Sequence, residues 1–269
     1  MRTSLVARFR CGVSPYSSAV EGVRATSVRL VTKIVVVHSR KGGVGKSTLS
    51  YELAWLLEAP LVDLDWEAGG VTRTWGYRPG DHLRRPLLDA FASGRTPRPL
   101  AGRASRRPDL VPNHPDFELE QPDADDMADA LKSWAGEWGS GYVVVDTHPG
   151  ASTATNGALQ IADAVVVPVP LSMKEIVGTE ATVQELAGFP LILVPNKVPR
   201  VPPPMMMREL EKVVEGTDAH VAPPVPAASA VATRRRRIAM AAEEPAPKAI
   251  AGVVSQIERV STYIKKALG

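Results

Sequence analysis

Short apolar runs rich in β-branched residues recur along the chain and alternate with segments of helical spacing. The first run, residues 33–38, contains Ile-Val-Val-Val, which is typical of a strand buried on both faces of a parallel sheet. A glycine-rich loop and a helical segment at 47–57 follow it. Further apolar runs lie at 61–64, 142–145, 164–169 and 191–194, and further helical segments at 125–138 and 174–187. This alternation predicts an α/β fold, a doubly wound and mostly parallel sheet with helices on both faces.

Two segments depart from the alternation. The first thirty residues hold five arginines against one acidic residue and have no clear period, so we expect 1–31 to be a disordered extension. A transit peptide or a DNA-contacting arm would have similar composition. Our hypothesis is that native translation starts at Val31 and that 32–269 form a single domain. Residues 94–122 are rich in Pro and Arg and are predicted to form a surface loop with one short strand near Leu110.

Composition narrows the classes of function. The chain has 269 residues, of which 44% are hydrophobic and 23% charged, enough for one sizeable core. Its longest apolar runs are far shorter than the roughly 18 residues that a membrane span needs. The single cysteine, Cys11, excludes an internal disulfide, a cysteine zinc cluster and an iron–sulfur centre. Oxygen and nitrogen chemistry in a reducing cytoplasm is therefore expected.

The glycine-rich loop after the first strand has the residues of a phosphate-binding loop. Its glycines let successive backbone N–H groups surround a phosphate, Lys46 supplies charge to the β- and γ-phosphates, and Ser47 offers a hydroxyl to Mg²⁺. The standard pattern G-x-x-x-x-G-K-[ST] is not met, because Arg40 stands in place of its first glycine and Lys41 follows. Since the loop lies between a buried strand and a helix, the sequence predicts nucleotide binding.

Three aspartates follow predicted strands that belong to the same sheet. Asp63 and Asp65 are two positions apart, so their side chains point the same way from the strand, and Asp146 ends another strand. A single aspartate at such a place would be read as a cap or a turn former. Three of them behind one phosphate loop lie where folds of this kind position ligand chemistry.

Several short blocks resemble the ParA/MinD family of P-loop ATPases. KGGVGKST is similar to the deviant Walker A motif of that family, most like the ParA partition ATPases. LVDLD at 61–65 resembles the second motif, and VVVDTHPG at 143–150 resembles the Walker B and switch region. Residues 165–186 are similar to the strand and the dimer-face helix of the family. The resemblance extends roughly from 32 to the C-terminus.

The resemblance implies ATP and Mg²⁺ as ligands and a homodimer that encloses the nucleotide. Lys41 would be the signature lysine, which reaches the phosphates bound by the other subunit, and Asp65 would orient the attacking water. Asp63 would support the magnesium shell, and Asp146 would hold Mg²⁺ through water together with Ser47. The implied nucleotide-binding residues are Gly42, Gly43, Val44, Gly45, Lys46, Ser47, Thr48 and Asn196. Asn196 would present its amide to adenine, and a loop asparagine at a strand end is the alternative interpretation.

Two departures from the family lie in its switch segments. After the second motif the relatives usually continue with Pro-Gln-Gly, whereas this chain has Trp66, Glu67 and Ala68 before Gly69-Gly70. His148 replaces the first of two prolines usual after the Walker B aspartate. Phosphoryl transfer depends mainly on positioning and charge stabilisation, so we interpret His148 as a loop residue.

The basic run near the C-terminus favours a role in plasmid or chromosome partitioning. The run consists of Arg234, Arg235, Arg236 and Arg237. By resemblance to ParA it would bind nonspecific DNA when ATP is bound, and a ParB-like protein would stimulate a slow hydrolysis. The alternative interpretation is a solvated basic loop. This function predicts a cytoplasmic protein that associates with the nucleoid.

Two other functions stay open at this point. Ile257, Val260, Ile264 and Leu268 form an apolar stripe, which a MinD-like ATPase that cycles on a membrane would use as an amphipathic anchor. We expect a helix docked on the core instead, because bulky interfacial residues are missing from it. The other alternative is an ATP-dependent DNA-binding scaffold that does not hydrolyse ATP.

Overall fold

The computed structural model of the protein describes residues 31–67 and 70–269. The predicted N-terminal extension, apart from Val31, lies outside the described residues, as do Ala68 and Gly69 of the altered switch.

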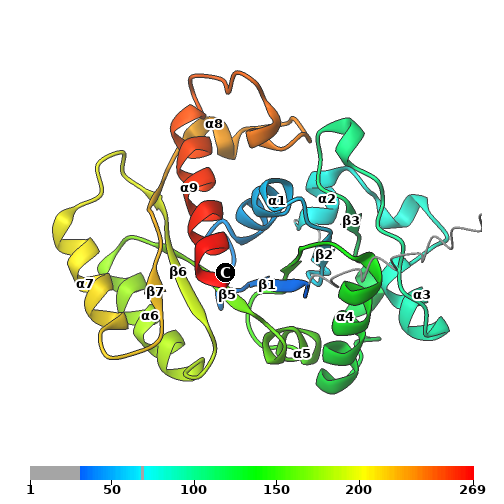
Figure 1. Ribbon diagram of the computed structural model, residues 1–269. Coiled ribbons are helices and arrows are strands. Elements are labelled where there is room, and N and C mark those ends of the chain that lie inside the picture. Colours follow the sequence, from blue (N-terminus) through cyan, green and yellow to red (C-terminus); the bar gives the residue numbers. More distant parts are fainter. Residues whose placement is uncertain (1–30, 68–69) are drawn as a thin grey trace, which may run out of the picture.

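One parallel sheet runs through the molecule (Figure 1). Its strands are β1 (Lys33–Val37), β2 (Leu61–Asp63), β3 (Leu110–Val111), β4 (Tyr142–Asp146), β5 (Ala164–Pro170), β6 (Leu191–Val198), β7 (His220–Val221) and β8 (Val225–Pro226). The strand order is β3-β2-β4-β1-β5-β6-β7, with β8 also paired to β6. Every ladder between these strands is parallel, which confirms the predicted sheet.

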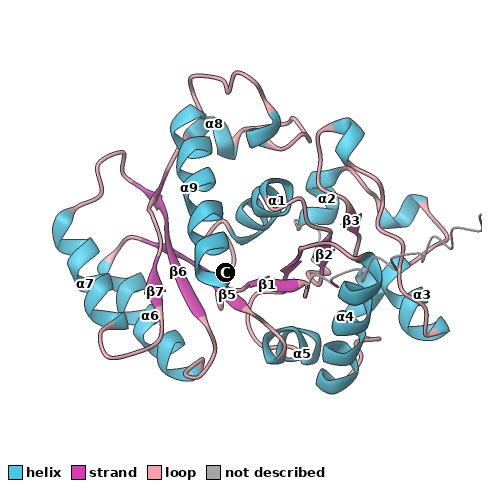
Figure 2. Ribbon diagram, in the orientation of Figure 1, coloured by secondary structure: helices cyan, strands magenta, loops and turns pink. Residues whose placement is uncertain are grey.

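Helices cover both faces of this sheet (Figure 2). They are α1 (Lys46–Leu56), α2 (Val71–Trp75), α3 (Pro86–Ser93), α4 (Ala124–Trp138), α5 (Thr153–Gln160), α6 (Met173–Glu185), α7 (Pro204–Val214), α8 (Ser229–Ala232) and α9 (Ala251–Leu268). Residues of α1, α2 and α9 pack on one face, and residues of α3 to α7 pack on the other. The doubly wound arrangement expected from the sequence is therefore present.

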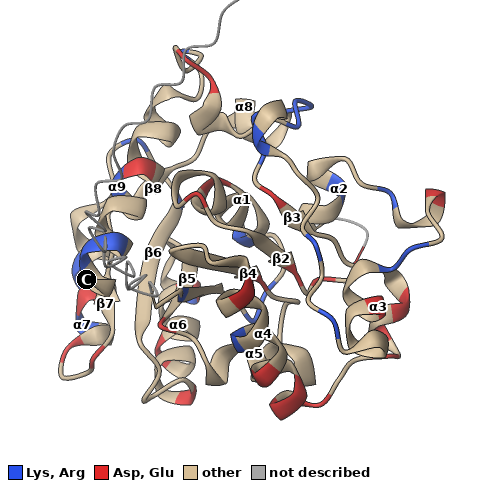
Figure 3. Ribbon diagram, turned by 45° about the vertical axis from the view of Figure 1, so that its right-hand side comes forward, with Lys and Arg blue, Asp and Glu red and all other residues tan. Residues whose placement is uncertain are grey.

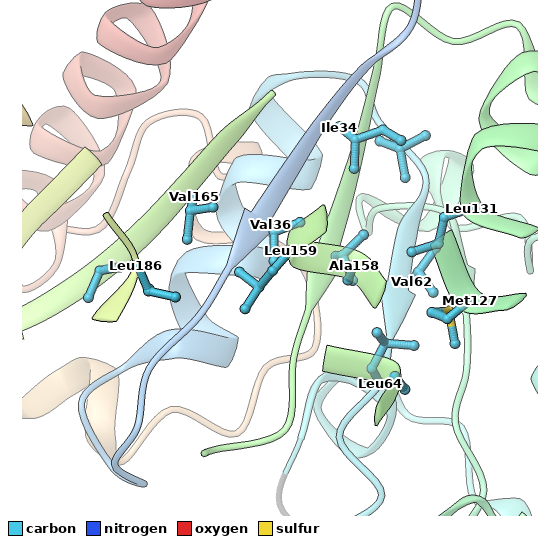
Figure 4. Packing of buried hydrophobic residues seen from close by; sticks show 14 of the residues in the cluster. Ile34, Val36, Val62, Leu64, Met127, Leu131, Ala158, Leu159, Val165 and Leu186 are labelled. Carbon is cyan, nitrogen blue, oxygen red and sulfur yellow. The ribbon is translucent and has the colours of Figure 1, made fainter. Parts of the chain in front are cut away.

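Alternate residues of each central strand belong to the two halves of the hydrophobic core, one on each face of the sheet. Val35 and Val37 of β1 face α1 and α9, whereas Ile34 and Val36 face α4 and α5 (Figure 4). Both sets are almost completely buried. A strand buried on both faces needs apolar residues at every position, which is why β1 reads as a continuous apolar run.

Side-chain caps fix where several helices begin. Asp123 accepts the backbone N–H of Asp126 at 2.8 Å, and α4 starts at the residue after Asp123. Ser152 and Ser172 make the equivalent bonds at the starts of α5 and α6. Each cap satisfies one of the backbone donors that a helix leaves unpaired at its N-terminus.

The C-terminal helix α9 is docked on the core, as the sequence predicted. Ile257, Val260 and Ile264 are buried against α1 and β8, and Leu268 is half-buried at the end of the stripe. The basic residues Lys265 and Lys266 are exposed. Within the described part of the chain, no helix is long and apolar enough to cross a bilayer.

Candidate functional site

The loop between β1 and α1 has the backbone shape of a phosphate cradle. Gly43 and Gly45 have φ values of 77° and 97°, a region that side chains disfavour. A Cβ added at Gly45 would collide with Nδ2 of Asn196, and any side chain at this φ would be strained, so both effects favour glycine there. No side chain caps the N-terminus of α1, which leaves its first backbone N–H groups available to an anion.

Lys46 lies at the start of α1 and points into a buried cluster of carboxylates. Its Nζ lies 3.2 Å from Oδ1 of Asp146 and 3.5 Å from Oδ2 of Asp65, and its side chain is 5% exposed. Burial works to lower the pKa of Lys46, but Asp146, Asp65 and Asp63 together raise it above its usual value. Lys46 is therefore charged and is the cation that balances this cluster.

The two carboxylate oxygens of Asp146, at the end of β4, differ in their hydrogen bonding. Its Oδ1 accepts the hydroxyl of Ser50 at 2.7 Å and faces Lys46, while its Oδ2 is buried without a hydrogen-bond partner. Burial raises the pKa of this carboxyl, and Lys46 opposes that rise. An orphaned buried carboxylate oxygen costs free energy unless a ligand takes it, so the donor set fits a hard cation.

The cavity in front of these residues has the composition of a magnesium–phosphate site. It encloses about 310 Å³ and is lined by the glycines of the loop, Lys46, Ser47, Thr48 and Asp65. Among the described residues, no three His, Cys, Asp or Glu side chains are arranged so that they alone could hold a metal ion. Mg²⁺ typically binds through one or two carboxylates together with phosphate oxygens and water. That chemistry fits Ser47, which lines the cavity, and Asp146, which is not part of the lining but lies 3.2 Å from Nζ of Lys46.

Asp63 uses both of its oxygens to order the segment after β2. Its Oδ1 accepts the N–H of Asp65 at 2.9 Å, and its Oδ2 accepts the N–H and the hydroxyl of Thr72 at 2.8 and 2.6 Å. Asp63 is fully buried and is the register partner of Asp146. Burial, followed by the charge of Asp146, raises the pKa of its carboxyl. The predicted role of Asp63 in a magnesium shell stays a prediction.

The two altered switch segments meet at Asp65. Its Oδ1 accepts the N–H of Glu67 at 3.2 Å and lies 3.1 Å from Nδ1 of His148. The imidazole of His148 stacks on the indole of Trp66, with ring centroids 3.8 Å apart and an interplanar angle of 10°. The sequence indicated Trp66 and His148 as separate departures, and it carried no signal that they touch.

Lys41 lies at the rim of the loop and is half exposed. Its Nζ is 3.0 and 2.9 Å from the two oxygens of Glu175 in the first turn of α6. Its neighbour Arg40 pairs with Glu185 at the other end of α6 at 2.6 Å. The loop therefore has one lysine at its surface, Lys41, and one in its interior, Lys46.

Asn196 supports the loop from the end of β6. Its Nδ2 donates to the carbonyl of Val44 at 2.8 Å, and its side chain is buried. A second cavity of about 440 Å³ begins here, lined by Gly45, Thr48, Asn196 and apolar residues of β8, α8 and α9. The contact of Asn196 with adenine stays a prediction, but its amide borders a largely apolar space beside the phosphate loop.

The arginine run does not present four equivalent cations. Arg234 and Arg236 both pair with Glu243, the latter at 2.7 Å. Arg235 and Arg237 are exposed and form no salt bridge within the described residues. The backbone carbonyl of Arg106, an exposed residue, accepts the N–H of Ala239 at 2.8 Å, which ties the segment around Arg106 to the end of the run. Basic residues accordingly lie beside α8 and around α2 (Figure 3).

The chain is similar to a curated relative in sequence and to solved structures in fold. No family model matches the chain. A curated relative, the chromosome partitioning protein ParA of Myxococcus xanthus, is 30% identical over 152 residues. The match covers 52% of each chain, so the protein spans about half the length of this relative.

Two solved structures share the fold over nearly their whole length. A putative plasmid partition protein of Borrelia burgdorferi, bound to AMPPNP, has a TM-score of 0.62 and 20% identity, over 87% of this chain and 99% of that one. The septum site-determining protein MinD of Pyrococcus horikoshii, complexed with Mg-ADP, has a TM-score of 0.65 and 17% identity, over 88% and 98%. Together with the glycine-rich loop and the carboxylates behind it, these matches confirm the resemblance of the chain to the ParA/MinD family of deviant Walker A P-loop ATPases.

Proposed function

We propose that the protein is a dimerising, Mg²⁺-dependent ATPase of the ParA type that acts in plasmid or chromosome partitioning. The observation that carries this proposal is the different burial of the two lysines of the loop. Lys46 is buried against Asp146, whereas Lys41 is exposed at the rim. The relative named as a chromosome partitioning protein and the partition protein bound to AMPPNP support it.

When ATP binds, phosphate oxygens would replace the carboxylates as the partners of Lys46. The backbone N–H groups of the loop and of α1 would bind the β- and γ-phosphates, and Lys46 would move its charge from the carboxylates to the phosphate oxygens. Mg²⁺, held by Ser47 and Asp146, would neutralise the charge that develops on the phosphates. Asp65, released by Lys46, would orient the attacking water with its Oδ2.

Dimerisation would bring Lys41 to the nucleotide of a second copy. To reach that nucleotide, Lys41 would break its surface salt bridge to Glu175. Such surface pairs contribute about 0 to 1 kcal/mol to stability. Met173 and Val177 on the same helix α6 are exposed, which suits a face that a second subunit covers. The release of Lys41 would therefore cost little free energy compared with the burial of these two apolar side chains.

The dimer would bind nonspecific DNA through its exposed arginines. Arg235 and Arg237 are exposed and would bind phosphates, whereas Arg234 and Arg236 are already paired with Glu243. Such contacts lose affinity steeply with salt, which suits a protein that grips the nucleoid and releases it. A ParB-like partner would trigger that release by stimulating hydrolysis.

The docked helix α9 argues against the MinD-like alternative. A membrane anchor would expose Ile257, Val260 and Ile264 to lipid, but these side chains are buried against α1. That alternative would require α9 to leave the core and open an apolar surface there.

DNA binding in the presence of ATP or ADP with Mg²⁺ tests the proposal. We expect binding only with ATP, and the double variant Arg235→Ala/Arg237→Ala should lower the slope of log K against log salt by about 2. Arg236→Ala is the matched control, since this neighbouring side chain is exposed but paired with Glu243. ATP-dependent dimerisation, measured by light scattering, should be the same in the wild type, the double variant and Arg236→Ala.

The other outcomes of this experiment identify the alternatives. Equal DNA binding by the double variant and the wild type would refute the proposed DNA face. ATP-dependent binding to anionic liposomes without DNA binding would favour the MinD-like function. Intact ATP-dependent DNA binding without any hydrolysis would favour the scaffold.

A further inference from the structure

The contact between His148 and Asp65 joins two loops that are distant in the sequence. Asp65 follows β2, whereas His148 follows β4, only two residues after Asp146. The 3.1 Å contact between Nδ1 of His148 and Oδ1 of Asp65 is largely shielded from solvent, with side chains 16% and 9% exposed. Because an ionised carboxylate can only accept hydrogen bonds, this contact is a hydrogen bond in the tautomer of His148 that has its proton on Nδ1.

The ring of His148 is held on a second side by Trp66. The two rings are nearly parallel, with an interplanar angle of 10°, and their centroids are 3.8 Å apart. Trp66 in turn contacts Phe117, which is fully buried, with centroids 6.4 Å apart. A ring fixed by stacking and by one hydrogen bond has little freedom left to turn. The imidazole is thus a rigid donor aimed at Asp65.

This arrangement decides which oxygen of Asp65 remains available. Oδ1 is occupied by the N–H of Glu67 and by His148, and Oδ2 is the oxygen that faces Lys46, in a residue that lines the cavity of the phosphate loop. The proline that the related proteins usually carry at this position has no side-chain donor and could not make this contact.

We propose that His148 is a positioning residue that holds the Asp65 carboxylate toward the phosphate site, and that Trp66 fixes His148, so that Asp65, Trp66 and His148 act as one unit. The inference rests on the proposed ATP hydrolysis. It predicts that both altered residues act together, although they are separate departures in the sequence. Loss of the donor should lower kcat, because a displacement of a catalytic group by about 1 Å can cost about a hundredfold in rate.

Two variants separate the hydrogen bond from the stacking. His148→Phe keeps an aromatic ring on Trp66 but has no donor, whereas His148→Asn keeps an amide donor near the place of Nδ1 but has no ring. We expect kcat for ATP to fall about ten- to hundredfold in His148→Phe, with KM changed less than about twofold. His148→Asn should recover most of the loss.

A second histidine that stacks on an aromatic ring provides a control. His82 stacks on Tyr77 with centroids 4.5 Å apart and an interplanar angle of 11°, and it takes no part in the hydrogen bonds of Asp65 described above. His82→Phe should leave kcat unchanged. Binding of a fluorescent ATP analogue and thermal unfolding, measured on every variant, would verify that the nucleotide site is intact.

The outcomes distinguish the inference from the proposed function. If the wild-type protein does not hydrolyse radiolabelled ATP in single-turnover assays with Mg²⁺ and DNA, the proposed hydrolysis fails and the inference fails with it. If the wild type hydrolyses ATP and His148→Phe matches it, the inference alone fails. If His148→Phe retains activity better than His148→Asn, stacking rather than donation is the role of His148, and the proposed positioning of Asp65 is wrong.

Discussion

Shortening one buried side chain of α9 tests whether this helix belongs to the core. Ile264 is completely buried against the face of the sheet that also carries α1. Ile264→Ala removes three carbons, worth about 2.4 kcal/mol of transfer free energy at about 0.8 kcal/mol each. The residual cavity raises the expected loss of unfolding free energy to about 3 to 4 kcal/mol.

Urea unfolding followed by circular dichroism measures this loss. Leu268→Ala removes as many carbons from the same stripe, but Leu268 is half-buried, so we expect a loss of less than about 1.5 kcal/mol. A loss below about 0.5 kcal/mol in Ile264→Ala, combined with weaker binding to anionic liposomes, would refute the reasoning. That result would mean that α9 is free in solution and functions as an anchor.

Three further substitutions test the site and its support. Gly45→Ala should abolish binding of a fluorescent ATP analogue, because its Cβ meets Asn196 and its φ is 97°; unchanged affinity would contradict the cradle geometry. Thr72→Val removes a hydroxyl that donates to Asp63, which should cost about 1 to 3 kcal/mol in denaturant unfolding, and an unchanged midpoint would contradict this. Burial first, and then nearby cations, lowers the pKa of His38 from 6.5 to about 4, so the unfolded chain binds more protons between these values. About 3 kcal/mol of stability, present above pH 6.5, should be lost as the pH falls through about 4, and His38→Gln should flatten that dependence in unfolding experiments.

The fold could be predicted because its central strands are short apolar runs separated by clear helical segments. β1, β4, β5 and β6 were all visible as such runs, since strands buried on both faces cannot alternate with polar residues. Most of the predicted ends differ from the observed ones by only one or two residues. The segment at 94–122 was predicted as a loop with a strand near Leu110, and β3 lies at Leu110–Val111.

The candidate site was predictable only where its residues are contiguous. The loop from Lys41 to Thr48 carries its own pattern, but the contact of His148 with Trp66 depends on how β2 and β4 are placed side by side. The pairing of Arg234 and Arg236 with Glu243 likewise arises from a chain reversal that composition does not reveal. Contacts between distant segments follow from the packed structure, and a single sequence does not contain them in readable form.

The order of the strands has a consequence for how the protein is made. β1 and β2 are synthesised first, yet they are not neighbours, because β4 lies between them and pairs with both. A ribosome therefore releases the glycine-rich loop long before the strand that must flank β1 has emerged. Until Tyr142–Asp146 is available, Lys46 lacks Asp146 and the first half of the sheet has an open gap. The nascent chain cannot close its phosphate site early, and pairing across so many residues favours folding after most of the chain has been translated.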